Sequence, residues 1–140
     1  MGRADLEPEV RIDARILREA MAEFIEFAGT GGAALVFSIG YNYGKRVAER
    51  ELSEGPVKLR DVLRVVQSWS KVSVKVKQGG EVLVVGSDDP FTVGFVSGCV
   101  SKVAEDLRVH YENSRALIAL KLKKGAADKS RIFSLLSILT

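Results

Sequence analysis

Side chains with catalytic or metal-binding potential are few in this 140-residue chain. It contains one histidine, His110, and one cysteine, Cys99. A protein nucleophile is normally activated by a neighbouring base, which a third group orients, and no second histidine is present to complete such a set. One histidine and one cysteine also fall short of the ligands that a metal site needs. The sequence therefore predicts no catalytic residues and no metal site, and we expect a protein that is not an enzyme.

Two short motifs resemble functional motifs but have simpler structural explanations. Asp88 and Asp89 form a carboxylate pair, yet Asp89 followed by Pro90 is typical of a helix start with Asp89 as the N-cap. Gly29-Thr30-Gly31-Gly32 resembles a phosphate-binding loop, but no strand is predicted before it and no Lys-Ser/Thr pair follows it. We expect a flexible turn there, followed by a helix over about residues 33–52.

The strongest pattern is two pairs of glycines, each with a spacing of four residues. Gly40 and Gly44 fall in the helix predicted over residues 33–52, and Gly94 and Gly98 fall in a helix predicted from residue 90 to about Leu107. This spacing puts both glycines of a pair on one helical face, although each costs roughly 1 kcal/mol relative to alanine. We therefore expect the two helices to approach each other closely at these glycines.

Aromatic residues accompany the glycines and indicate a ligand pocket. Missing side chains beside large rings can leave a lined cavity, and an apolar cavity with few polar groups is the usual form of a ligand site. The alternative is that the same rings simply fill the core. The residues predicted to line the pocket are Phe37, Tyr41, Trp69, Phe91, Phe95 and Cys99.

The rest of the chain predicts helices and hairpins. Apolar residues recur at helical spacing over residues 14–28 and 59–68. Alternating valines and polar residues predict a hairpin over residues 71–85, and a second hairpin follows over residues 108–123. Strands that come as two hairpins favour an α+β fold, with an antiparallel sheet and helices packed on one face. The open face of the sheet would carry Lys71, Lys75, Lys77, Lys121 and Lys123.

Composition narrows the functional classes further. The chain is 46% hydrophobic and 28% charged with a net charge of +3, which is ordinary for a globular domain. So small a basic excess gives no reason to expect nucleic acid. The longest apolar run is about half of a membrane span, so no stable membrane insertion is expected. A lone cysteine fits a reducing cytoplasmic environment.

The succession of these motifs resembles the 4-vinyl-reductase-type domain, whose superfamily includes haem-based nitric-oxide sensors and the TRAPP vesicle-tethering subunits. The resemblance rests on Phe37-Ser38-Ile39-Gly40-Tyr41-Asn42-Tyr43-Gly44, a helix leading to Trp69, a valine-rich hairpin, the Asp-Asp-Pro-Phe helix start and a closing hairpin. Family members carry cysteines around the last hairpin as a suspected metal site. This chain has none between Val109 and Lys123, so we expect no cofactor.

These observations predict three parts: a flexible N-terminus over residues 1–9, one α+β domain over residues 10–123, and a linker with an apolar C-terminal helix over residues 124–140. Two functions remain open. The first is a non-catalytic sensor or carrier that holds an apolar small molecule between the helices and the sheet. The alternative, a homodimeric interaction module of TRAPP-like type, needs no ligand. In either case we expect a homodimer, with the apolar tail from Ile132 to Leu139 as the main contributor to its interface.

Overall fold

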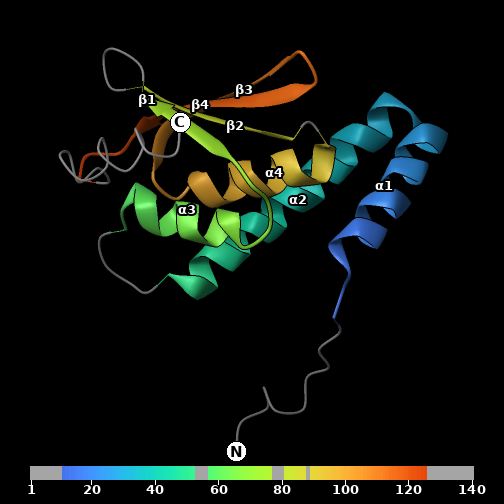
Figure 1. Ribbon diagram of the computed structural model, residues 1–140, viewed down its shortest axis with the longest axis horizontal. Helices are drawn as coiled ribbons and strands as arrows, with labels where there is room; N and C mark the ends of the chain where they lie inside the picture. The colour runs from blue at the N-terminus through green and yellow to red at the C-terminus, as the bar shows by residue number, and fades with distance from the viewer. Residues whose placement is uncertain (1–10, 53–56, 77–80, 88, 126–140) are drawn as a thin grey trace, which may run out of the picture.

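The computed structural model describes residues 11–52, 57–76, 81–87 and 89–125. Its elements, in chain order, are α1 (Ala14–Ala28), α2 (Thr30–Glu51), α3 (Leu59–Gln67), β1 (Ser73–Val76), β2 (Val82–Ser87), α4 (Pro90–Val100), β3 (Ala104–Glu112) and β4 (Arg115–Leu122). The strands form one antiparallel sheet in the order β1-β2-β4-β3, and α2, α3 and α4 lie on one side of it (Figure 1). The predicted α+β fold is therefore confirmed. The predicted C-terminal helix lies outside the described residues.

Helix α4 occupies the centre of the fold, between the sheet and α2 (Figure 1). Every residue from Phe91 to Val100 is buried. Asp89 caps the helix, because the backbone N–H of Thr92 donates to Asp89 Oδ2 at 3.2 Å, and Pro90 takes the first position. A helix that is covered all round has no need of a polar face, which explains the almost uniformly apolar sequence of α4.

The inner face of the sheet supplies the other half of the core. Val74 pairs with Val84, and Val84 pairs with Ile118 across three strands, and all three side chains are buried. Burial of an aliphatic side chain of this size stabilises the fold by roughly 1.5–3 kcal/mol. Helix α3 covers part of the same core through Leu59, Val62, Leu63 and Val66.

Most of the lysines predicted for the open face of the sheet are exposed. Lys71, Lys75, Lys121 and Lys123 are all exposed, whereas Lys77 lies outside the described residues. Lys121 Nζ lies 3.7 Å from Glu105 Oε1, an exposed ion pair of the kind that contributes little to stability.

The predicted boundary between α4 and the second hairpin is wrong. Helix α4 ends at Val100 instead of near Leu107, and β3 begins at Ala104 instead of Arg108. The backbone N–H of Val103 donates to the Val100 carbonyl at 3.0 Å, which closes the helix in a tight turn. Val100, Val103 and Leu107 fit helical spacing as well as they fit the start of a strand, so periodicity alone did not locate the change.

The flexible turn predicted over Gly29–Gly32 is wrong as well. Only Gly29 departs from helical geometry, and α2 begins directly at Thr30. Gly32 is buried within the helix, where an added Cβ would lie 2.7 Å from the Cβ of Ala28. Glycine at this position allows α1 and α2 to meet closely, which is a packing role and not a loop role.

Helices α2 and α4 touch backbone to backbone. Cβ atoms built at Gly40 and Gly44 would collide with the backbone of α4, and those built at Gly94 and Gly98 would collide with the backbone of α2. At Gly44 the added Cβ would lie 2.9 Å from the carbonyl carbon of Phe95, well inside the roughly 3.5–4.0 Å at which carbon atoms attract each other. The structure thus places all four glycines in one interhelical contact.

Because this contact has no room for a side chain, Gly44→Ala should destabilise the protein even though alanine is the better helix former. We expect a loss of roughly 1–3 kcal/mol from overpacking, measured as a thermal midpoint lowered by several degrees. Gly31→Ala is the matched control, since it lies in the same helix and no atom lies within 4 Å of its Cβ position. Its midpoint should stay the same or rise slightly. Equal midpoints for the two variants would contradict the close contact.

Candidate functional site

Three of the six predicted pocket residues form a cluster of rings. The Trp69 ring centroid lies 5.3 Å from that of Phe91 and 5.6 Å from that of Phe95. Tyr43 joins the cluster, with centroid distances of 6.1 Å to Phe91 and 5.8 Å to Phe95. Trp69 Nε1 donates to Thr92 Oγ1 at 3.2 Å, so the polar end of this side chain is engaged within the protein.

The other two aromatic residues lie elsewhere. Phe37 and Tyr41 stack on each other along α2, with 6.4 Å between ring centroids. With 3.6 residues per turn, Tyr41 and Tyr43 point to nearly opposite sides of their helix. Tyr43 belongs to the ring cluster and Tyr41 therefore faces away from it. The rings chosen from the sequence are divided between two sides of α2.

The sixth predicted residue, Cys99, belongs to the contact between α2 and α4. Its side chain is fully buried, and Sγ donates to the carbonyl of Gly44 at 3.3 Å. Burial disfavours the charged thiolate and raises the pKa of Cys99 from 9.0 to about 12. At neutral pH the thiol is therefore protonated, and because the thiolate is the reactive form of cysteine, Cys99 is inert in the folded protein.

The buried thiol should react with a disulfide reagent only after unfolding. At pH 8 we expect slow modification of native protein and rapid modification in guanidinium chloride, both measured by released chromophore. The folded pKa lies above the unfolded value, so the unfolded chain gives up the thiol proton first and rising pH favours unfolding between about pH 9 and 12. Cys99→Ala should lessen that loss of stability. Rapid labelling of the native protein at pH 8 would show that the thiol is accessible.

A cavity of about 220 Å³ lies between α1, α2 and the start of α4, and we call it the helix cavity. Its walls are mostly apolar, with one cation and one carboxylate. Arg18 Nε lies 3.9 Å from Asp89 Oδ2, and the guanidinium of Arg18 lies over the Trp69 ring, 5.3 Å from its centroid. The lining residues are Arg18, Met21, Ala22, Ile25, Val36, Asp89, Pro90 and Phe91.

The helix cavity and the pocket predicted from the sequence share Phe91. Half of the lining residues come from α1, which the sequence predicts only as an amphipathic helix. Arg18 lies three and seven residues before Met21 and Ile25, so it belongs to the same helical face as these apolar residues. A charged residue on an apolar face was the available signal for this site.

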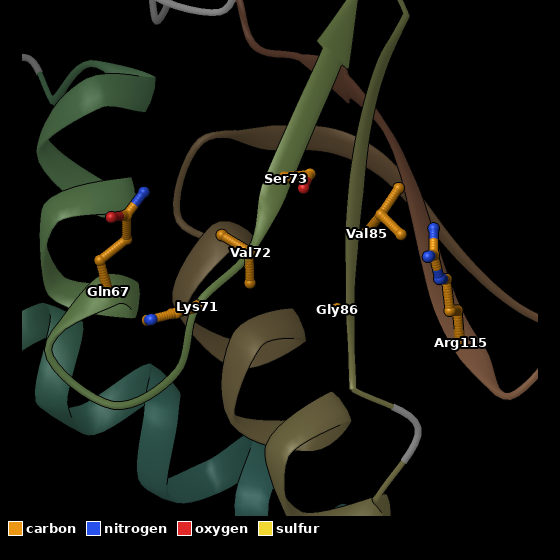
Figure 2. A pocket seen from close by; sticks show the side chains of 7 residues that line it. All are labelled: Gln67, Lys71, Val72, Ser73, Val85, Gly86 and Arg115. Atoms are coloured by element: carbon orange, nitrogen blue, oxygen red, sulfur yellow. The ribbon is translucent and has the colours of Figure 1, made fainter. Parts of the chain in front are cut away.

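A second hollow, of about 570 Å³, is open to solvent at the rim of the sheet. It is lined by Gln67, Lys71, Val72, Ser73, Val85, Gly86 and Arg115. Figure 2 shows Lys71 pointing toward α3 on one side of the hollow, whereas Arg115 stands on β4 on the other side. The two cations do not converge on a common point, so this hollow lacks the arrangement that would hold an anion.

Large apolar side chains are exposed on two consecutive helices, α1 and α2. Leu35, Ile39 and Tyr43 follow one another at intervals of four and form one stripe on α2, and Phe24 on α1 approaches within 3.4 Å of the Cβ position of Gly32. Phe24 of α1 therefore lies beside the first turns of α2. We use the name α1–α2 face for the large exposed apolar residues of these two helices, which are Ile16, Phe24, Phe27, Leu35, Ile39 and Tyr43.

Other kinds of site have less support in the part of the chain that the structure describes. Within it, no group of three or more His, Cys, Asp or Glu side chains is placed to hold a metal ion. His110 is exposed on β3. None of the helices among the described residues has the length and apolarity needed to cross a membrane.

Comparison with known proteins identifies no relative of this chain. No family model matches it, and neither the curated proteins nor the solved structures contain a match. The function is therefore inferred from the helix cavity and the α1–α2 face.

Proposed function

We propose that this protein is a non-catalytic interaction module that forms a homodimer through the α1–α2 face. The observation that carries the proposal is the exposure of its six large apolar side chains, which ranges from 42% for Phe24 to 91% for Phe27. Monomeric proteins rarely expose contiguous apolar patches larger than a few hundred Å². A single aromatic side chain has about 150–250 Å² to bury, so this face approaches the roughly 800 Å² per partner of a stable interface.

A second copy of the chain is the partner that fits this surface. A two-fold interface brings the same patch of both subunits together, which suits the α2 part of the face because residues 30–44 contain no charged side chain that would repel its own copy. The six members of the face are uncharged. The stripe of Leu35, Ile39 and Tyr43 is also a ridge of the i±4 type, which packs into the groove of another helix in the commonest helix–helix geometry.

Homodimers are also what the resemblance to TRAPP-like domains implies, and the proposal extends that resemblance to this chain. The proposal requires neither a cofactor nor a ligand. The tail from Ile132 to Leu139, expected from the sequence to make the dimer contact, lies outside the described residues. Support for the dimer therefore comes from the α1–α2 face alone.

A charge in the middle of the face should separate the subunits. Light scattering should give twice the chain mass of 15.3 kDa for the wild type and a single chain mass for Ile39→Glu, because an unpaired carboxylate is costly to bury in an interface. Ala34→Glu is the control, since it introduces the same charge at an exposed position of the same helix, on a different side. A wild type that is monomeric at high concentration would refute the proposal.

The helix cavity supports a second candidate function, a small-molecule sensor or carrier. Its volume of about 220 Å³ exceeds the roughly 150 Å³ that suffices for a protein cavity to bind benzene. Most of its wall is apolar, and Arg18 and Asp89 provide the few polar groups that orient a ligand in a typical site. The ligand would lie between α1 and α4, and not beside the sheet as expected from the sequence.

Titration with small apolar compounds should change the fluorescence of Trp69 if the cavity binds them. Trp69 is the only tryptophan, and its ring contacts Arg18 in the cavity wall. Ala22→Leu should reduce the response, because it adds volume at an exposed position that lines the cavity. An unchanged response in this variant, or none in the wild type up to the solubility limit, would exclude the carrier function for this cavity.

A further inference from the structure

Helices α1 and α2 are joined by a single residue. Helix α1 ends at Ala28, α2 begins at Thr30, and Gly29 between them has φ 76° and ψ −154°. This region of backbone conformation is open essentially to glycine alone. No atom lies within 4 Å of a Cβ built at Gly29. Glycine is therefore required here by the backbone dihedral angles and not by close packing. The bend between the two helices therefore depends on the two dihedral angles of Gly29.

The hydrogen bonds on both sides of Gly29 already follow the helical pattern. Its N–H donates to the Ile25 carbonyl at 2.7 Å, and the Ala33 N–H donates to the Gly29 carbonyl at 3.1 Å. Both are i to i−4 bonds of an α-helix. The bend interrupts only the bonds that residues 30–32 would make to residues 26–28, and no side chain caps the start of α2. If Gly29 took helical angles, the backbone N–H groups of residues 30–32 would bond to the carbonyls of residues 26–28.

Helix α1 is weakly held to the rest of the protein. None of its residues is fully buried. Its ion pair, from Arg18 Nε to Asp89 Oδ2 at 3.9 Å, joins side chains that are 37% and 29% exposed, and such pairs contribute little. Arg18 Nε finds no hydrogen-bond partner among the described residues. The helix cavity leaves part of the inner surface of α1 without packing partners. Departure of α1 would therefore break few polar interactions, and the apolar packing lost would be that of the partly buried Met21 and Ile25 against the core.

A straight helix would bring the exposed apolar residues into register. In a continuous helix Phe27 and Leu35 are eight positions apart, so they lie within about 80° of each other on one side of the helix. At 1.5 Å per residue they are separated by about 12 Å along its axis. In the bent form the turn at Gly29 separates Phe27 from Leu35, and Phe27 is 91% exposed. Straightening thus brings an exposed apolar residue of α1 and one of α2 onto the same side of a single helix.

We infer that Gly29 is a hinge between the bent form of the structure and a straight form in which residues 14–51 make one helix. The straight form is the one that pairs with a second copy. Each α1 then docks on α2 and α4 of the other copy, so the packing that α1 makes within its own chain is re-formed between chains, which is the low-cost route of domain swapping. This inference rests on the proposed function and names the form of the chain in which the homodimer assembles.

Two substitutions at the hinge should act in opposite directions on the dimer. Gly29→Ala strains the bent form, because alanine avoids its positive φ, and it favours a continuous helix. Its dimer dissociation constant, measured by analytical ultracentrifugation, should fall at least tenfold. Thr30→Pro fits the first position of α2 but blocks a continuous helix, since proline lacks an N–H and clashes with the preceding turn. Its dissociation constant should rise at least tenfold.

Glu49→Ala is the control for both variants. It changes an exposed residue near the end of α2, far from the hinge, at a position that is helical in either form. The dissociation constant of this variant should stay within about twofold of the wild type, because its small gain in helix propensity is common to both forms.

A distance measurement follows the hinge directly. Spin labels on cysteines introduced at Glu19 and Glu49, both exposed, would be separated along a continuous helix by 30 residues, or about 45 Å. The bend brings them closer together. Buried Cys99 stays unlabelled, and dilution with unlabelled protein removes distances between subunits. Gly29→Ala should shift the distribution toward the long distance, and Thr30→Pro toward the short one.

The outcomes separate the hinge from the dimer itself. Equal dissociation constants for Gly29→Ala, Thr30→Pro and the wild type would overturn the hinge and leave a dimer through the α1–α2 face intact. A tighter dimer for Thr30→Pro would also overturn it, because the bent form would then be the one that pairs. Failure of Ile39→Glu to dissociate the dimer would refute the proposed interface instead.

Discussion

The backbone contact between α2 and α4 is the constraint on which the rest of this fold depends. With glycine at Gly40, Gly44, Gly94 and Gly98, neither helix presents a side chain along the line where they meet. The large side chains of α4 are therefore directed to the flanks of that line. The ring cluster forms there, and the sulfur of Cys99 is close enough to bond the opposite backbone.

The same contact determines what is left on the surface. Helix α2 is apolar around much of its circumference, but only the side that bears Val36, Gly40 and Gly44 enters the core. Its neighbouring stripe, with Leu35 and Ile39, stays about half exposed. Since helix stability in proteins comes mostly from packing of an apolar face, a helix with a second, uncovered apolar stripe indicates another partner. The surface of α2, more than the interior of the protein, therefore points to function.

Much of the architecture was predictable because it depends on local patterns. Alternation located β1, β2 and β4, helical spacing located α1 and α3, and Asp89-Pro90 identified the start of α4. The end of α4 was not predictable, since the spacing of Val100, Val103 and Leu107 is compatible with a helix and also with the start of a strand. The helix cavity was missed for a different reason. Arg18 meets Trp69 and Asp89 only because α1 folds back over the start of α4, and no local pattern in the sequence specifies that meeting.

Glycine shows most clearly why residue type alone did not decide the local structure. Gly29, between α1 and α2, and Gly44, within α2, are both glycines, but their structural roles are opposite. At Gly44 the backbone of Phe95 leaves no space for a side chain, so glycine holds two helices in a fixed relation. At Gly29 the space is empty and the dihedral angles are special, so glycine permits a bend that other residues would resist. One glycine makes the core rigid, and the other leaves the position of α1 dependent on a single pair of rotations.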